Sequence, residues 1–86
     1  MDSFDGHSEL YQGYARQLAQ RLRVLRDERH IAQEYVAYHA GIPTFTYQKF
    51  EKGESNPGTP MNPRFSTIIA LAMVFEIEPW ELIRFE

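Results

Sequence analysis

The turn formed by Gly41, Ile42 and Pro43 constrains the fold of this chain more than any other feature. Glycine adopts the left-handed conformation that closes a helix, so Gly41 is expected to end a helix over residues 33–40. Proline is tolerated at the first helical position because its missing N–H would be unpaired there, so Pro43 marks the start of a helix that Gly53 closes. Two short helices joined by a glycine-containing turn have helix-turn-helix geometry.

Three further segments also predict helices. Leu18, Leu22 and Leu25 recur at helical spacing and form an apolar stripe along the first of them. The second segment, which ends at Phe75, is the most apolar in the chain, so we expect it to lie at the centre of the core. These three helices are expected over residues 8–29 with Ser8 as N-cap, from Asn62 and Pro63 through Phe75, and from Pro79 onward.

No segment alternates polar and apolar residues in the manner of a strand. Residues 54–62 hold one glycine and two prolines, which predicts a flexible loop. The pattern therefore predicts an all-α fold with five helices. A chain of 86 residues accommodates one domain, expected over residues 8–86 behind a flexible tail of residues 1–7.

Composition excludes several classes of function. The chain has no cysteine, which rules out disulfides and zinc sites that use thiolates. His7, His30 and His39 show no metal-ligand spacing, and no arrangement of a nucleophile with a base is visible. We therefore expect neither an enzyme, nor a cofactor, nor a small-molecule ligand. The sequence has no secretory signal and no long apolar run, which predicts a cytoplasmic protein without a membrane span.

Charge is unevenly distributed along the chain. The net charge is −3, which argues weakly against nucleic acid as a partner. Residues 16–52 nevertheless carry seven basic and four acidic side chains, whereas the two flanks together carry two basic and eight acidic ones. The basic middle is able to face phosphates while the acidic ends face away, and an ordinary mixed surface explains the same pattern. The arginines at 21, 23, 26 and 29 allow the same two interpretations: a row of phosphate contacts, or a solvated helix face.

The order of several motifs resembles the Cro and lambda-repressor-like helix-turn-helix family, often called the Xre family. The resemblance covers about residues 14–85, and each motif alone is weak. It implies a five-helix DNA-binding domain, with the helix-turn-helix at the second and third helices, and a transcriptional regulator that binds double-stranded DNA. The matching positions are Leu25–Arg26, Gln33, Ala37, Gly41, Glu51–Gly53 and Asn56–Pro57.

The resemblance also implies roles for individual residues. Residues at the start of the third helix match positions that face base edges, and residues around them match positions near the DNA backbone. Gln33 in addition matches a residue that braces the third helix. The base-contacting set is Thr44, Phe45, Gln48 and Lys49. The phosphate-contacting set is Gln33 and Thr46, with Lys52 and Arg23 as less direct matches.

Four departures from the family pattern affect these roles. Ala32 and Pro43 occupy positions that usually hold a capping Ser or Thr, so both caps are lost. His30 replaces a frequent glycine. The loop after the third helix is about six residues longer than usual; it either touches the DNA backbone or is a neutral insertion, and the sequence favours the neutral insertion.

Phe45 occupies a position where a polar side chain is expected. A phenyl ring makes no hydrogen bond to a base edge, but it packs against the methyl group of thymine. Thr44 has a methyl group of its own, and Lys49 has the length to reach guanine or a phosphate. We therefore expect a half-site that contains thymine. The alternative is that Phe45 turns inward into the core, or packs on Tyr11 or on the long loop after the third helix.

The end of the chain is more apolar than a free helix terminus requires. Trp80, Ile83 and Phe85 are expected to form the seam of a homodimer, which would place two third helices about one DNA turn apart; the alternative is that they close the core of a monomer. We expect a repressor that acts by occupying a promoter. Two alternatives remain: an antitoxin-type regulator with a toxin partner, and a protein-interaction module that docks through Phe45, Tyr35 and Tyr38.

Overall fold

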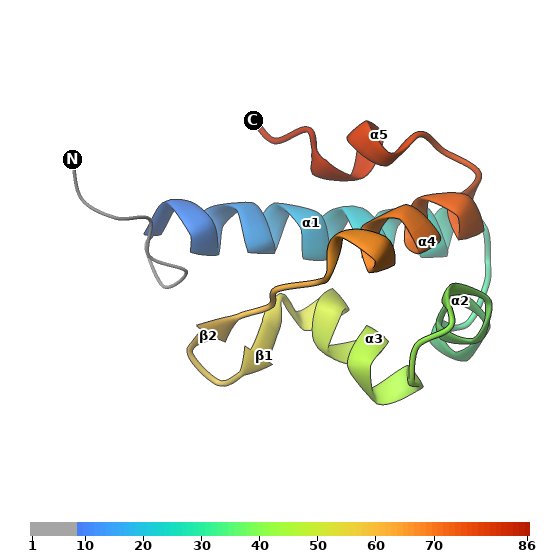
Figure 1. The fold of residues 1–86 in the computed structure, drawn as a ribbon, viewed down its shortest axis with the longest axis horizontal. Helices are drawn as coiled ribbons and strands as arrows, with labels where there is room; N and C mark the ends of the chain where they lie inside the picture. The colour runs from blue at the N-terminus through green and yellow to red at the C-terminus, as the bar shows by residue number, and fades with distance from the viewer. Residues whose placement is uncertain (1–8) are drawn as a thin grey trace.

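The computed structural model describes residues 9–86, so the expected tail of residues 1–7 and the expected cap at Ser8 lie outside the described residues. Within that range the order of elements is helical apart from one short hairpin (Figure 1). The elements are α1 (Glu9–Glu28), α2 (Gln33–Ala40), α3 (Thr44–Lys52), β1 (Glu54–Asn56), β2 (Thr59–Pro60), α4 (Phe65–Phe75) and α5 (Pro79–Ile83).

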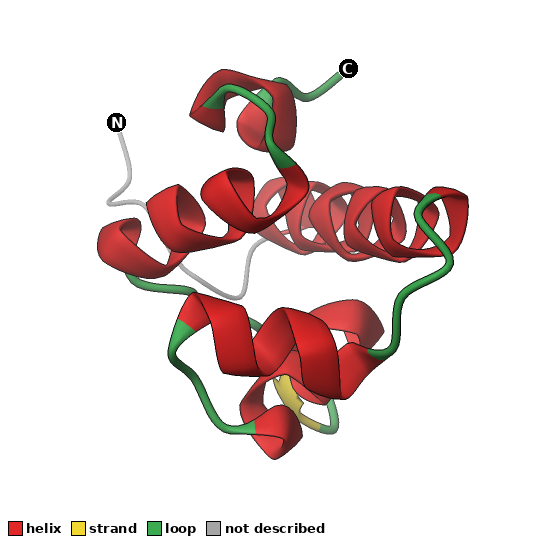
Figure 2. Ribbon diagram, turned by 90° about the vertical axis from the view of Figure 1, so that its right-hand side faces the viewer, coloured by secondary structure: helices red, strands yellow, loops and turns green. Residues whose placement is uncertain are grey.

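The long helix α1 forms a spine against which the other elements pack. In Figures 1 and 2, α5 lies on one side of α1 and α4, whereas α2, α3 and the hairpin lie on the opposite side. The core fills the space between them, and it includes Leu22, Val36, Leu71, Phe75 and Leu82, none of which is exposed to solvent. None of the helices described in residues 9–86 is both long and apolar enough to cross a membrane.

The helix boundaries around the turn follow the sequence. Gly41 and Gly53 both adopt the left-handed conformation, with φ of 73° and 81°, and each donates its N–H to the last turn of the helix that it ends. Ala32 and Pro43 precede α2 and α3 without a side-chain cap, as expected. Pro79 opens α5, as expected.

The prediction of a strictly all-α fold was wrong. The segment expected to be a flexible loop contains the antiparallel strands β1 and β2, joined by Pro57 and Gly58. Gly58 has a φ of 80°, which the third position of a tight turn after proline commonly requires. The sequence Asn-Pro-Gly-Thr is itself a signal for such a turn, but strands of three and two residues are too short to show alternation.

The predicted start of α4 at Asn62 and Pro63 was also wrong, because the helix begins at Phe65 with Arg64 at the N-cap. A tertiary contact overrides the local signal. The Met61 N–H donates to the Gly53 carbonyl at 2.9 Å, and the Tyr11 hydroxyl donates to the Met61 carbonyl at 2.8 Å. Met61 is itself buried, so this segment stays extended until it has passed the core.

We expect Gly53→Ala and Gly41→Ala each to destabilise the fold. Both residues have positive φ, so either substitution strains the backbone by about 1 kcal/mol. A Cβ at Gly53 would make ordinary contact with the Ala19 Cβ on α1 at 3.4 Å, and a Cβ at Gly41 would meet nothing within 4 Å, so neither substitution adds a clash. Urea unfolding of the two variants measures the losses, and a variant as stable as the wild type would contradict the backbone strain at that glycine.

Candidate nucleic-acid interface

The pair α2 and α3 forms a helix-turn-helix. Val36 and Ala37 of α2 are fully buried, and the Ile42 N–H in the turn donates to the Ala37 carbonyl at 3.0 Å. Helix α3 turns Tyr47, Phe50 and Glu51 inward. Its remaining residues are half-buried or exposed, so one face of α3 is available to a partner.

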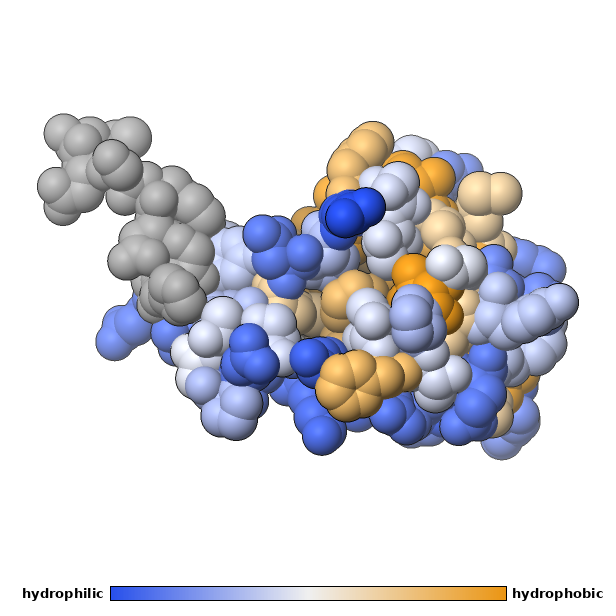
Figure 3. Space-filling model, turned by 60° about the horizontal axis from the view of Figure 1, so that its bottom comes forward, coloured by the Kyte–Doolittle hydropathy of each residue, from blue (hydrophilic) through white to orange (hydrophobic). Residues whose placement is uncertain are grey.

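Most of the predicted base-contacting residues lie on one surface. Phe45 is 67% exposed, which contradicts the alternative that it turns into the core. Phe45, Gln48 and Lys49 line one wall of a groove of about 310 Å³ together with Lys52, and the hairpin lines the other wall. Thr44 and Thr46 are half-buried and do not line this groove. The face that carries α3 and the hairpin is largely hydrophilic, with isolated hydrophobic side chains (Figure 3).

Phe45 and Lys49 interact with each other one helical turn apart. The Lys49 ammonium lies 4.5 Å from the centre of the Phe45 ring, within the range of a cation–π contact. Such a contact at an exposed site is worth about 0.5–1 kcal/mol, enough to bias the orientation of both side chains. An apolar ring and a positive charge are therefore presented side by side.

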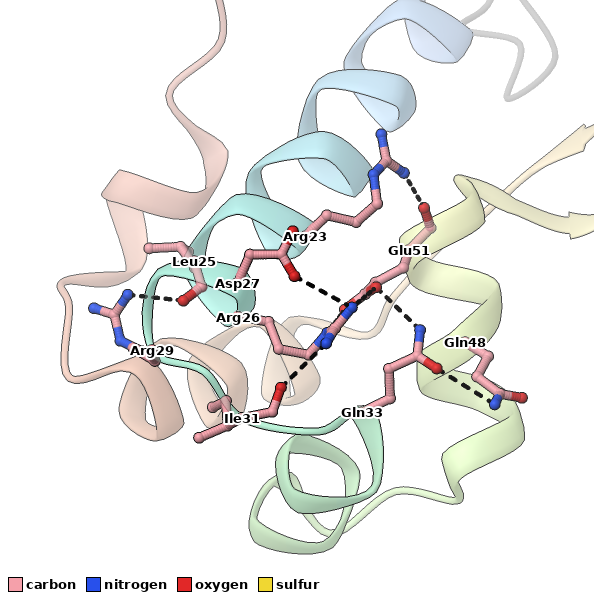
Figure 4. Close-up of polar contacts among 9 residues, drawn as sticks. All are labelled: Arg23, Leu25, Arg26, Asp27, Arg29, Ile31, Gln33, Gln48 and Glu51. Carbon is pink, nitrogen blue, oxygen red and sulfur yellow. Dashed lines mark hydrogen bonds and ion pairs between the residues drawn. The ribbon is translucent and has the colours of Figure 1, made fainter.

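Beneath the exposed face, a buried carboxylate joins three helices (Figure 4). Arg26 of α1 contacts Glu51 of α3 through two hydrogen bonds of 2.6 and 3.1 Å. Gln33 of α2 donates to the same carboxylate at 3.0 Å and accepts a longer bond, 3.4 Å, from Gln48. The chain of contacts thus runs from the spine of the fold to a residue on the outer face of α3.

The Glu51 carboxyl stays ionised although it is buried. Burial on its own raises its pKa, but the hydrogen bonds from Arg26 and Gln33, the nearby Tyr47 hydroxyl and the charge of Arg26 outweigh this and hold the pKa below its ordinary value. The hydrogen bond to Glu51 in turn raises the pKa of Arg26. For Tyr47, burial first and the neighbouring Glu51 second raise the pKa of the hydroxyl, which lies beside the carboxylate without the alignment of a full hydrogen bond.

Gln33 occupies the bracing position that the resemblance implies, since its amide bridges Glu51 and Gln48. Its contact with a phosphate remains a prediction. The bridge fixes the orientation of Gln48, because both ends of the Gln33 amide are engaged and its oxygen accepts the Gln48 N–H. Glu51 was not among the residues singled out for function, although an acid within an otherwise inward-facing helix surface is a recognisable signal.

The arginines of α1 hold the ends of other helices. The last carbonyls of a helix have no partner within it, and a guanidinium satisfies them well. Arg23 donates to the Glu51 carbonyl at the end of α3, and Arg29 donates to the Phe75 carbonyl at the end of α4 at 2.9 Å. Arg21 donates to the Leu82 carbonyl in α5 at 2.8 Å.

These contacts favour a structural role for the arginine row. Arg23, Arg21 and Arg29 use part of their donor capacity inside the fold, so a row of phosphate contacts along α1 is not needed to explain them. The sequence showed the charges but not their partners, which lie 28 to 61 residues away along the chain. The phosphate contact expected of Arg23 stays a prediction, and so does that of Lys52, which is exposed at the end of α3.

The residues expected in a dimer seam divide into two groups. Trp80 and Ile83 are 59% and 43% exposed, so they do not complete the core of this chain. Phe85 is half-buried and stacks on Tyr14 of α1, with 4.8 Å between the ring centres. Phe65, at the start of α4, is 77% exposed, although it belongs to the apolar segment that the sequence places at the centre of the core.

A short helix that follows a glycine turn and carries polar, cationic and aromatic side chains on its outer face has the geometry of the recognition helix in the helix-turn-helix class. Among solved structures, the chain is similar to the restriction-modification controller protein C.AhdI from Aeromonas hydrophila, with a TM-score of 0.68 and 31% sequence identity. The match covers 79% of this chain and 94% of C.AhdI. The chain belongs to the Cro and lambda-repressor-like helix-turn-helix regulators. No protein-family model and no curated protein sequence matches it.

Proposed function

We propose that this protein binds double-stranded DNA in a sequence-specific manner, with α3 in the major groove. The observation that carries the proposal is the exposed face of α3, on which Phe45, Gln48 and Lys49 point toward one groove while Glu51 and Gln33 fix the helix from behind. A major groove admits an α-helix, and its base edges present the donors, acceptors and methyl groups that such side chains distinguish.

The electrostatics of this face are compatible with DNA despite the negative net charge. Both ion pairs within residues 9–86 are made by Arg26, so Lys49 and Lys52 have no carboxylate partner there. Lysines of this kind release counterions when they contact phosphates, which makes the affinity fall with salt. Gln33, Thr46, Lys52 and Arg23 are the proposed phosphate-contacting residues.

Phe45 is proposed to select thymine through its methyl group. We expect Phe45→Ala to weaken binding to the preferred duplex about tenfold, because losing the correct match at one base pair typically costs about 1–3 kcal/mol. Replacing the contacted thymine by uracil removes only the methyl group, and it should weaken the wild type but not the variant. A variant that still distinguishes thymine from uracil would assign the methyl contact elsewhere, with Thr44 as the next candidate.

A homodimer is proposed to present two α3 helices to a near-palindromic site. Trp80 and Ile83 are the exposed residues that support it, and a two-fold pair mirrors the symmetry of the DNA. We expect Ile83→Asp to sediment as a monomer at concentrations where the wild type is dimeric. Tyr38→Asp, on the 81% exposed Tyr38 of α2, is the matched control and should leave the dimer intact; dimers in both variants would exclude this seam.

We infer that the bound protein represses transcription by occupying a promoter. The similarity to C.AhdI, a restriction-modification controller protein, supports a more specific setting, in which this chain controls the genes of a restriction-modification system. A reporter fused to the promoter of its own gene tests the sign: repression predicts lower reporter output when the protein is supplied, and increased output would identify an activator.

The rival function is docking of another protein through exposed aromatic residues. Tyr35 and Tyr38 are exposed on α2 and both rings lie against His39, so the three rings form a small cluster, and Phe45 is a further exposed ring on α3. Selection of duplexes from a random DNA library at two salt concentrations separates the two functions. Enrichment of an inverted repeat whose binding weakens with salt supports the DNA-binding function, whereas absence of binding even at low salt favours the docking function.

A further inference from the structure

The hairpin of β1 and β2 is fixed to the body of the protein. At its base, the Met61 N–H donates to the Gly53 carbonyl, and Tyr11 of α1 holds the Met61 carbonyl. Gly53 itself lies so close to α1 that an added Cβ would touch Ala19. A segment held in this way loses little freedom when a partner binds, and ordering a flexible loop would cost affinity.

Two hollows lie on either side of the hairpin base. The groove of about 310 Å³ lies between α3 and the hairpin, and a second hollow of about 140 Å³ lies between α1 and the hairpin. Lys52 and Glu54 line both of them, so together the hollows form one track across the base of the hairpin. The tip of the hairpin, residues 56–58, is exposed.

Positive charges outnumber negative ones along this track. Lys49 lines the α3 side, Lys52 the middle and Arg16 the α1 side, whereas Glu54 is the acid that lines the two hollows. Neither ion pair within residues 9–86 involves these three cations, because both belong to Arg26. A row of cations in polar surroundings suits a polyanion better than an apolar protein surface.

We propose that the hairpin is a second DNA-contacting element, and that the sugar–phosphate backbone of one strand crosses its base from Lys49 past Lys52 to Arg16. The tip then lies beside that strand, with the Asn56 side chain toward the phosphates. The inference rests on the proposed function, since α3 must first occupy the major groove. It assigns the longer segment after α3 a role in binding, where the sequence had favoured a neutral insertion.

Two substitutions on the hairpin test the proposal in opposite directions, using duplexes enriched from the random library. Asn56→Glu places a negative charge beside the phosphates and should weaken binding about threefold to tenfold. Glu54→Gln removes a negative charge from the track and should strengthen binding by about twofold to fivefold. A gain of affinity cannot result from misfolding, which keeps the test valid if Asn56→Glu disturbs the hairpin.

Gln20→Glu is the matched control, because it adds the same charge as Asn56→Glu. Gln20 is exposed on α1 and lines neither hollow. In ethylation interference, some ethylated phosphates should weaken binding of the wild type. The phosphates that contact Arg16 should no longer do so for Arg16→Ala. Equal affinities for wild type, Asn56→Glu and Glu54→Gln would overturn the hairpin contact while leaving the proposed function intact. If the wild type itself binds no duplex, the proposed function fails and the hairpin contact fails with it.

Discussion

Arg26→Met is expected to lower the free energy of unfolding by about 3–5 kcal/mol, the largest stability change that we predict for a single side chain. The substitution removes the two hydrogen bonds that Arg26 donates to the Glu51 carboxylate. It leaves the negative charge of Glu51, a residue that is 5% exposed, without its cation. Methionine has a similar length to the arginine stem, so little packing is lost. Chemical denaturation near neutral pH measures the effect.

The pH dependence of this loss has a defined sign. In the wild type the pKa of Glu51 lies below its ordinary value of 4.5, so the carboxylate stabilises the fold above that pH and loses this contribution as the pH falls through the lowered pKa. In Arg26→Met the hydrogen bonds and the charge of Arg26 are lost, so the pKa of Glu51 should be higher than in the wild type. Acidification then costs the variant less stability than it costs the wild type, and the gap between their free energies of unfolding narrows.

A double variant provides the control for this experiment. Arg26→Met with Glu51→Met removes both charges, and exchanging a buried ion pair for apolar residues of similar volume is often neutral or stabilising. The double variant should therefore be more stable than Arg26→Met alone. A single variant as stable as the wild type, or a gap that does not change with pH, would show that Glu51 is not held by Arg26.

Lys49→Glu is expected to reduce affinity for the selected duplex by about 100-fold, the largest effect on binding that we predict. The change removes a cation proposed to contact DNA, adds a repelling charge in the same place and abolishes the contact with the Phe45 ring. Each lost phosphate contact also makes the slope of log affinity against log salt less steep, by about 0.9. Lys49→Gln, which removes the charge without reversing it, should give an intermediate affinity.

Arg84→Glu is the matched control for Lys49→Glu, because it changes the net charge by the same amount. Arg84 is exposed and follows α5, on the opposite side of the molecule from α3 (Figure 1). Titrations of both variants at two salt concentrations distinguish a local contact from a general charge effect. Equal losses of affinity would mean that the net charge of the protein governs binding, and that Lys49 has no special position.

The helices were predictable because their signals are local. Gly41, Gly53 and Pro79 act through their own backbone preferences, so the boundaries that depend on them agree with the structure. Asn62 and Pro63 carry an equally good local signal for a helix start, yet Met61 is held in an extended segment by groups from α1 and α3. A signal that spans two residues gives no information on such long-range contacts.

The residues on the outer face of α3 could be predicted from their positions in the helix, whereas the buried contacts that hold α3 could not. Phe45 and Lys49 lie on the exposed side of α3, as their spacing from the buried Tyr47 and Phe50 predicts. The bidentate contact of Arg26 with Glu51 joins residues 25 apart along the chain, and the sequence shows only two charges among many. Similarly, the contact of Arg23 with the end of α3 was not foreseeable from a basic helix face.

The arginine contacts of α1 have a consequence for how the protein unfolds locally. Arg23, Arg29 and Arg21 of α1 bind carbonyls in α3, α4 and α5, respectively. Opening any one of these three helices therefore breaks a contact with α1. Contiguous elements that share their contacts tend to open as one cooperative unit. Amide hydrogens in the last turns of α3 and α4 should therefore exchange with solvent at similar free energies, close to that of global unfolding.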